Sequence, residues 1–326
     1  MPSDPDHGQR WAHERSHVPL PIILVNGEVR DEFIVSGMQL LLRGASAGDV
    51  AEHIARAVED DPEEHTVGYG GWPNSLGEVE LDASFMDGAT LRAGAVAALK
   101  GFRHPISVAR QVMARLPHVL LVGEGAARFA EEIGAERRDM LSPEARAAWQ
   151  AHAARFADAP AESVIDLTLR MLEQPIGHDT MNVIVRDANG HLCTAVTTSG
   201  IAWKYPGRVG DSAIIGAGNY CDDRYGAATC MGLGEAAIRT CAAAQAVTLM
   251  RFGYSLETAG QQVAQQLAAL LGEADHRVHT NWVRLLLIDA QGHFGGFATR
   301  PGLHFKVQTA HDQWPTTHEA VSITQA

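Results

Sequence analysis

The chain has 326 residues, of which 46% are hydrophobic and 20% charged, as in folded globular proteins, so disorder is excluded as the main state. The formal net charge of −13 argues against a nucleic-acid or anionic-lipid partner. No apolar window is long enough to span a membrane, and the polar N-terminus carries no secretory signal. We therefore expect a soluble, cytoplasmic protein with one large α/β fold or about two average domains.

Cysteine and histidine give no sign of a metal or cofactor site. Four cysteines in this length do not form a disulfide framework, and they lack the paired spacing of a zinc site. The sixteen histidines are scattered, with no H-E-x-x-H pattern. We therefore expect neither a metal nor a cofactor.

The first half of the chain combines apolar runs with helix starts and glycine-rich turns. Residues 21–25 form a continuous apolar run, which predicts a buried strand. Ser46 is placed as the N-cap of an amphipathic helix, and Ser142 with Pro143 marks another helix start. Three further predictions are turns and short strands over 66–101, a helix from Pro105 and a short strand over 118–122.

The second half begins after a linker-like stretch, and residues 161–176 are either a helix or a mobile segment. The alternation over 181–185 and the turn over 187–190 predict a hairpin whose second strand contains Leu192. Further predictions are helices over 235–251 and 256–271, a strand over 283–288 and a last strand over 293–299. Hairpins with helices between them indicate a layered sandwich of antiparallel sheets flanked by helices.

Thr180 follows the linker and begins the strand over 181–185. One interpretation is a helix cap or a β-forming residue. The functional alternative is an N-terminal nucleophile, since a cut before Thr180 would give this residue both a hydroxyl and an α-amine. The α-amine has a pKa of about 7.7–8.0, so one residue would supply nucleophile and base near neutral pH.

Arg208 and Asp211 lie three residues apart within a segment that contains Gly207 and Gly210. Opposite charges at this spacing often form a surface ion pair. Alternatively they form a clamp for an α-amino acid, because arginine binds a carboxylate bidentately and aspartate accepts from an ammonium group. Such a local site would let a protein with a large negative charge bind an acidic substrate.

Two further motifs, which are weaker signals, also have both a structural and a functional interpretation. Gly232-Leu233-Gly234 precedes a helix and is either a tight turn or an oxyanion site built from backbone N–H groups. Thr197-Thr198-Ser199-Gly200 lies at a strand end, where hydroxyl groups usually serve turn formation.

Together these segments make the chain similar to the glycosylasparaginase family of N-terminal nucleophile hydrolases, from about Leu20 to beyond Phe297. The motifs that carry the resemblance are 67–71, 76–77, 81–83, 86–88, 120–124, 178–180, Thr198, Gly200, 207–212, 216–218 and 232–234. The resemblance implies an α/β (α+β) fold, a four-layer αββα sandwich that forms a single domain over 1–326. It also implies a precursor that cuts itself between Asp179 and Thr180 into 1–179 and 180–326, and a homodimer of cleaved protomers.

The resemblance also implies roles for particular residues. Thr180 resembles the nucleophile and Thr198 the hydroxyl that orients it. Arg208 resembles the residue that binds the substrate α-carboxylate, and Asp211 the residue that binds its α-amino group. The N–H of Gly232 resembles an oxyanion-hole donor, and Gly234 is expected to be a substrate-binding residue.

Two positions depart from the family pattern. Where the family has an oxyanion-hole threonine before the glycine, this chain has Met231, which cannot donate a hydrogen bond. Where the family has an aromatic residue near the N-terminus that lines the substrate pocket, this chain has Glu28. The sequence therefore predicts an intact nucleophile beside an altered substrate pocket.

Three functions are compatible with these residues. The first is an amidohydrolase that cleaves the side-chain amide of a small asparagine derivative, N4-(β-N-acetylglucosaminyl)-L-asparagine foremost, through a β-aspartyl-threonine ester. The second is an isoaspartyl peptidase or L-asparaginase. The third is a self-processing protein that binds aspartate-like ligands with little turnover, which the missing hydroxyl at position 231 would favour.

Overall fold

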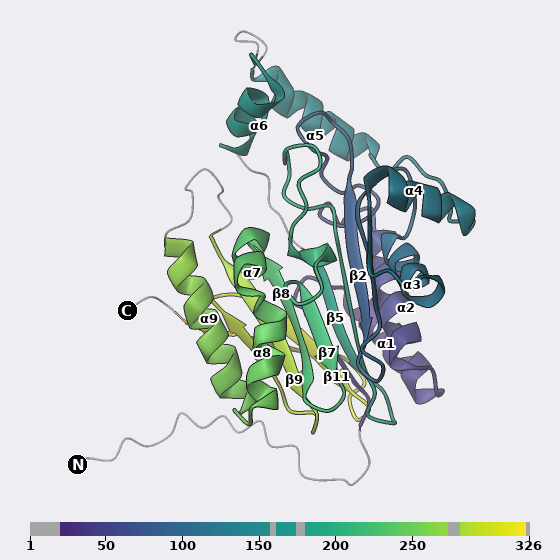
Figure 1. The fold of residues 1–326 in the computed structure, drawn as a ribbon, viewed down its shortest axis with the longest axis vertical. Helices are drawn as coiled ribbons and strands as arrows, with labels where there is room; N and C mark the ends of the chain where they lie inside the picture. The colour runs from purple at the N-terminus through teal and green to yellow at the C-terminus, as the bar shows by residue number, and fades with distance from the viewer. Residues whose placement is uncertain (1–19, 157–160, 174–179, 273–280, 324–326) are drawn as a thin grey trace, which may run out of the picture.

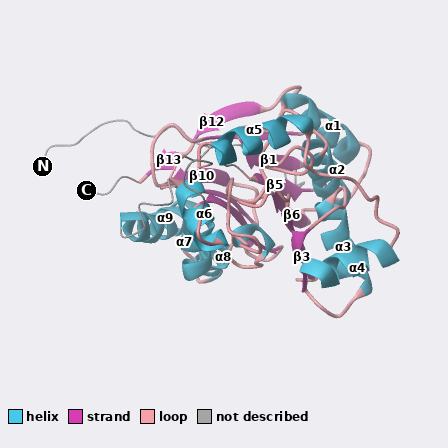
Figure 2. Ribbon diagram, turned by 90° about the horizontal axis from the view of Figure 1, so that it is seen from above, coloured by secondary structure: helices cyan, strands magenta, loops and turns pink. Residues whose placement is uncertain are grey.

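Two β-sheets stack face to face between two layers of helices in the computed structural model (Figures 1 and 2). The structure describes residues 20–156, 161–173, 180–272 and 281–323. Within these residues, one sheet has eight strands in the order β12-β11-β1-β5-β6-β2-β3-β4, and the other has five in the order β13-β10-β9-β8-β7. This arrangement confirms the predicted four-layer αββα sandwich.

The larger sheet consists of β1 (Ile22–Asn26), β2 (Leu81–Asp87), β3 (Ala93–Leu99), β4 (Leu120–Val122), β5 (Met181–Arg186), β6 (Leu192–Thr198), β11 (His304–Thr309) and β12 (Thr316–Glu319). The smaller sheet consists of β7 (Asn219–Asp222), β8 (Gly226–Gly232), β9 (Val283–Asp289), β10 (Phe294–Ala298) and β13 (Val321–Ser322).

Helices cover the outer face of each sheet. The larger sheet packs against α1 (Asp31–Leu42), α2 (Ala47–Glu59), α3 (Pro105–Arg115) and α4 (Gly123–Glu132). The smaller sheet packs against α7 (Gly234–Thr240), α8 (Ala242–Arg251) and α9 (Leu256–Gly272). Figure 1 shows α5 (Pro143–Ala154) and α6 (Val164–Leu172) across one end of the sandwich. Among the described residues, no helix is long and apolar enough to cross a membrane.

Side chains of β5 alternate between two hydrophobic cores, as the period of a strand requires. Met181, Val183 and Val185 contact the helix-covered core of the larger sheet. Ile184 belongs instead to the core between the two sheets. Thr180 and Asn182 share the parity of Ile184, so this alternation directs their side chains between the sheets.

Several sequence predictions need correction. The helix expected over 235–251 is two helices, α7 and α8, because Cys241 between them has a left-handed backbone with φ of 50°. The strand predicted over 293–299 is not the last, since β11, β12 and β13 follow it. Helix α1 was also not predicted. Residues 164–172 are helical, in agreement with the helical interpretation of 161–176.

Candidate active site

The space between the sheets is apolar over most of its length and polar at one end. Its apolar part includes Leu24, Ile184 and Leu286. At the polar end, the terminal residues of several strands place uncharged and charged side chains together. The buried members of this group are Asn26, Asp82, Thr180, Asn182, Thr198 and Arg284.

Thr180 precedes β5 and is 9% exposed. Its hydroxyl donates to Oγ1 of Thr198 across 3.4 Å, a long hydrogen bond of the kind that tightens when substrate binds. Thr198 Oγ1 also accepts from the Gly200 N–H at 2.9 Å and donates to the Thr66 carbonyl at 3.2 Å. The Thr198 hydroxyl is therefore fixed by the backbone on two sides and can orient that of Thr180.

Arg208 pairs with Glu235 and not with Asp211. Its Nε and Nη2 atoms donate to the two carboxylate oxygens of Glu235 at 2.9 and 2.8 Å. Burial alone would lower the pKa of Arg208, but the charge and hydrogen bonds of Glu235 outweigh it and raise that pKa. A Cβ atom added to Gly200 or Gly210 would lie 3.5 or 3.0 Å from Nη1. The Nη1 side of the guanidinium therefore adjoins the loop that holds Thr198.

Asp211 begins a short 3₁₀ turn, Asp211–Ala213, and is 4% exposed. Burial raises the pKa of its carboxyl group to about 7, although the charge of Arg208 opposes this shift. Its Oδ2 atom accepts no hydrogen bond from the described residues. Since a buried acceptor without a donor is costly, a bound ammonium group would satisfy this oxygen.

Gly232 and Gly234 are required by close backbone contacts. Gly232 has φ of +115°, and a Cβ atom there would lie 2.2 Å from the carbonyl oxygen of Trp282. A Cβ atom on Gly234 would lie 2.9 Å from the backbone N and from Oδ1 of Asp211. These glycines therefore have a structural reason to be present that is independent of any role in catalysis.

Asn182 links the strand that follows Thr180 to the segment that precedes Gly232. Its Nδ2 atom donates to the carbonyl of Cys230 at 3.0 Å, and its backbone N–H donates to Oδ1 of Asn26 at 2.9 Å. Sequence reasoning missed this residue, although asparagine is uncommon inside strands. The structure thus brings Thr180, Thr198, Arg208, Asp211, Gly232 and Gly234 to one end of the sandwich, while their roles stay predictions.

The two departures from the family pattern, Glu28 and Met231, meet at a third residue. Arg284 is 0% exposed, and its Nη2 atom donates to Oε2 of Glu28 and to Sδ of Met231, both at 2.7 Å. Its Nη1 donates to Oε1 of Glu28 at 3.3 Å and to the His304 carbonyl. Sequence reasoning missed Arg284, for which the signal is an arginine inside the apolar run 283–288.

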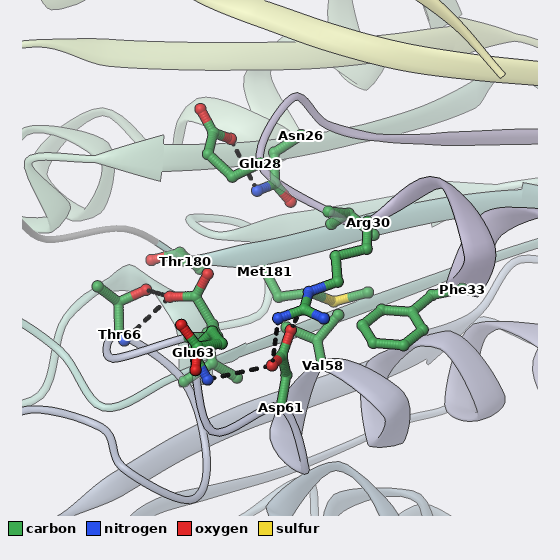
Figure 3. Close-up of a pocket in the computed structure, with 13 residues that line it drawn as sticks. Asn26, Glu28, Arg30, Phe33, Val58, Asp61, Glu63, Thr66, Thr180 and Met181 are labelled. Carbon is green, nitrogen blue, oxygen red and sulfur yellow. Dashed lines mark hydrogen bonds and ion pairs between the residues drawn. The ribbon is translucent and has the colours of Figure 1, made fainter. Parts of the chain in front are cut away.

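Glu28 lines a cavity of about 130 Å³ beside Thr180. Figure 3 shows Glu28 and Asn26 on one side of Thr180, and Thr66 with Glu63 on the other. The charged residues that line the cavity are Glu28, Arg30, Asp61, Glu63 and Glu64. Carboxylates therefore outnumber guanidinium groups around the hydroxyl of Thr180.

A buried lysine and a buried aspartate lie behind the clamp residues. Lys204 Nζ donates to the Glu80 carbonyl at 3.1 Å and lies 4.0 Å from Oδ2 of Asp82. Burial raises the pKa of Asp82 and lowers that of Lys204. Asp82 pairs with Thr198 in the sheet, so this charge pair borders the same polar end. Sequence reasoning gave neither residue a role in the site, although charged groups within buried segments are uncommon.

A four-layer αββα sandwich with a threonine at the head of a central strand defines the class of N-terminal nucleophile hydrolases. The family model described as "Asparaginase" matches residues 7–310, and the chain belongs to this family. Among curated relatives, it is 36% identical to "N(4)-(Beta-N-acetylglucosaminyl)-L-asparaginase" of Elizabethkingia miricola, which covers 90% of this chain and 82% of that protein. It is 41% identical to "Isoaspartyl peptidase" of Salmonella typhimurium, over 82% and 84% of the two chains. It is 34% identical to "Plant-type L-asparaginase" of Thermococcus kodakarensis, over 81% and 83%.

The family confirms two expectations from the sequence. The chain is a hydrolase that acts on amide C–N bonds, and its substrates are small molecules. The predicted cleavage site is only partly visible, because Asp179 lies outside the described residues while Thr180 lies within them.

Proposed function

We propose that the protein cuts itself before Thr180 and then hydrolyses the side-chain amide of N4-substituted L-asparagines through a β-aspartyl-threonine ester. The observation that carries this proposal is the hydrogen bond from the Thr180 hydroxyl to Thr198 Oγ1. Gly200, two residues after Thr198, lies beside Nη1 of Arg208. A nucleophile and a head-group clamp then share one end of the sandwich.

Self-cleavage would begin with attack of Thr180 Oγ1 on the carbonyl carbon of Asp179. The Oγ1–C bond forms and the peptide C–N bond breaks, and the nitrogen takes a proton to become the α-amine of Thr180. Water then hydrolyses the ester and releases the carboxylate of Asp179. The products are residues 1–179 and 180–326, which stay together as one domain and which we expect to pair as a homodimer.

Catalysis would repeat this chemistry on the substrate. The neutral α-amine of Thr180, with a pKa of about 7.7–8.0, accepts the proton of Oγ1 while Oγ1 bonds to the amide carbon. The N–H of Gly232 stabilises the oxyanion. The C–N bond then breaks, the leaving nitrogen takes the proton, and water hydrolyses the ester to free aspartate and Thr180.

The clamp would hold the α-amino acid end of the substrate. Oδ2 of Asp211, which accepts no hydrogen bond from the described residues, would receive the α-ammonium group. Arg208 would receive the α-carboxylate at Nη1, or at Nε and Nη2 once Glu235 moves away from them. Glu235 is half exposed, so solvent can take over its carboxylate.

Two leaving groups compete within this proposal. The relative from Elizabethkingia miricola favours a glycosylated asparagine, as its name states. The relatives from Salmonella typhimurium and Thermococcus kodakarensis favour isoaspartyl peptidase or L-asparaginase activity. The carboxylate of Glu28 at the cavity wall, in place of an aromatic side chain, disfavours a glycan as leaving group and, within the second candidate, favours L-asparaginase over isoaspartyl peptidase activity.

Two measurements test the proposal. Mass spectrometry under denaturing conditions should find two chains that part before Thr180; active protein that stays a single chain would contradict the mechanism. Assays with glycosyl-asparagine, a β-aspartyl dipeptide and L-asparagine side by side should give release of aspartate. Tight binding of all three without product would instead indicate a binding protein.

A further inference from the structure

The leaving group of the substrate should lie in the cavity beside Glu28. Arg208 is connected to Thr180 through Gly200 and Thr198, so the clamp fixes the acyl part of the substrate on that side of the nucleophile. In a linear β-aspartyl amide, the group on the amide nitrogen extends away from the α-amino acid end. Thr180 lines the charged cavity, whereas Arg208, Asp211 and Gly234 do not, so this cavity is a space beside the nucleophile that the clamp leaves to the leaving group.

Glu28 is held at the wall of this cavity as an anion. Both of its oxygens accept from the buried Arg284, and Asn26 Nδ2 donates to Oε2 at 2.9 Å. Burial would raise the pKa of Glu28, but the charge and hydrogen bonds of Arg284 outweigh it and lower that pKa. The side chain of Glu28 is still 40% exposed, whereas that of Arg284 is 0% exposed. A molecule bound in the cavity would therefore contact the carboxylate of Glu28 and not the guanidinium of Arg284.

The rest of the wall adds negative charge. Arg30 is the cation among the described residues that line the cavity, and its Nε lies 2.6 Å from Oδ2 of Asp61. Glu63 is exposed, and the carboxylate of Glu64 accepts from the Thr66 N–H at 3.0 Å. The pair of Arg30 with Asp61 leaves three carboxylates on the wall, those of Glu28, Glu63 and Glu64. Since Arg284 balances the charge of Glu28 from outside the cavity lining, the excess negative charge is two, which a cationic group would reduce.

We propose that Glu28, held by Arg284, is a specificity-determining residue that selects, together with Glu63, a leaving amine bearing a second, positively charged group. The substrate class is then the N4-aminoalkyl asparagines, in which a diamine is joined to the β-carboxyl group. An amino acid as leaving group would bring a carboxylate into the same acidic cavity and should react more slowly. This inference rests on the proposed function.

The test uses three substrates that differ only at the end of one chain. L-Asparagine is substituted at N4 with a four-carbon spacer that ends in an ammonium, a methyl or a carboxylate group. We expect kcat/KM to fall in that order, with the ammonium compound about tenfold above the methyl compound, or ~1.4 kcal/mol. Raising the salt concentration to 0.5 M should narrow this gap, because screening weakens an exposed charge pair.

Three variants test whether Glu28 and Glu63 cause the preference for the ammonium compound. Glu28→Gln and Glu63→Gln should each lower the ammonium-to-methyl ratio of kcat/KM by about threefold or more, since each removes one charge of the wall. Glu132→Gln, on the exposed face of α4, changes the net charge equally and should leave the ratio unchanged. The ratio of kcat/KM values is taken within one protein, so a loss of folded Glu28→Gln protein does not affect it. Glu63 forms no ion pair with the residues that the structure describes, so Glu63→Gln breaks none there.

The outcomes separate this inference from the proposed function. Equal rates for the ammonium and methyl compounds, or hydrolysis confined to glycosyl-asparagine, would overturn the inference and leave the function intact. A preference for the ammonium compound that persists in both glutamine variants would overturn the assignment to Glu28 and Glu63. If no substrate, including L-asparagine, releases aspartate, the function fails and the inference fails with it.

Discussion

The two sides of Thr180 are assembled in different ways. On the acyl side, Arg208 and Asp211 come from one short segment that contains Gly210, and Gly234, two strands further along the chain, packs against Asp211. On the leaving-group side, Glu28, Met231 and Arg284 come from three distant segments and meet in one buried network. By the resemblance drawn from the sequence, the acyl side matches the pattern expected of the family, and the leaving-group side departs from it at Glu28 and Met231. We therefore expect that the chemistry of the reaction and the selectivity for the leaving group can change separately.

The largest effect should come from the nucleophile that both sides share. Thr180→Ala removes the hydroxyl needed for self-cleavage and for the ester, so we expect an uncut chain with kcat lower by at least ~10⁴-fold. Mass spectrometry and a single-turnover assay measure both effects. Thr198→Ala is the comparison, because it should slow turnover without unfolding. Full activity in Thr198→Ala would remove Thr198 from the site.

The leaving-group side should be sensitive to loss of a single partner. Glu28→Gln leaves the guanidinium of Arg284 buried without its carboxylate. Since the side chain of Glu28 is 40% exposed, water and the new amide oxygen offset part of this cost, and we expect a loss of about 1–3 kcal/mol. The double variant Glu28→Gln with Arg284→Met removes both charges and should recover most of that stability. Urea unfolding of the wild type, both single variants and the double variant gives the coupling. Additive losses would mean that the two residues do not act as one unit.

The acyl side should respond in substrate binding. Arg208→Lys keeps the charge but loses bidentate geometry, and we expect kcat/KM to fall by roughly 100-fold, or ~2.7 kcal/mol, for substrates with a free α-carboxylate. Steady-state kinetics should place most of this loss in KM. Arg137→Lys, in an exposed pair with Glu131, is the matched control. A normal KM in Arg208→Lys would make the residue a structural partner of Glu235 only.

Asp211 should give the acyl side a pH dependence. Burial raises the pKa of its carboxyl group to about 7, so in the free enzyme it is largely neutral below that pH. Only the ionised form attracts an α-ammonium group. The α-amine of Thr180 must also be neutral and titrates at about 7.7–8.0 with every substrate, so we expect kcat/KM to rise about a hundredfold per pH unit below about 7 and about tenfold per unit just above it. A substrate that lacks the α-amine should keep only the tenfold slope.

The same group affects stability in the opposite direction. Because the pKa of folded Asp211 lies above the value of about 3.9 in an unfolded chain, the folded protein binds more protons between these values. The contribution of Asp211 to stability is therefore present at low pH and is lost as pH rises toward about 7. Asp211→Asn should flatten this part of the stability profile. An unchanged profile would show that Asp211 does not titrate in this range.

The sequence predicts more of the acyl side of the site than of the leaving-group side. The strand that follows Thr180, the hairpin that brings Thr198 beside it and the local clamp motif are all encoded over short stretches, so alternation and spacing predict them. The pairing of β1 with β11 and the meeting of Glu28 with Arg284 join residues far apart along the chain. No local pattern reports such contacts. Cys241 ends α7 with a left-handed backbone, which a helical pattern of apolar residues does not predict.

Met231 lies at the boundary between the two sides and should have the smallest effect. Met231→Thr places a hydroxyl where the family has an oxyanion-hole donor, and from the sequence alone a rise in kcat of roughly tenfold is expected. Met231 is 1% exposed and its sulfur accepts from Arg284. A threonine would therefore leave a void and direct part of its hydrogen bonding to the guanidinium. We expect a rise in kcat of about two- to fivefold, which is under ~1 kcal/mol.

The pattern of that rise decides to which side Met231 belongs. The Glu28–Arg284 pair remains in Met231→Thr, so the rise should be the same for ammonium, methyl and carboxylate leaving groups, with KM little changed. A uniform rise places position 231 with the acyl side, because the oxyanion forms on the acyl carbon whatever group leaves. If instead the ammonium-to-methyl ratio changes, Met231 acts through Arg284 on Glu28, and the oxyanion hole of this enzyme is built without a side chain at position 231.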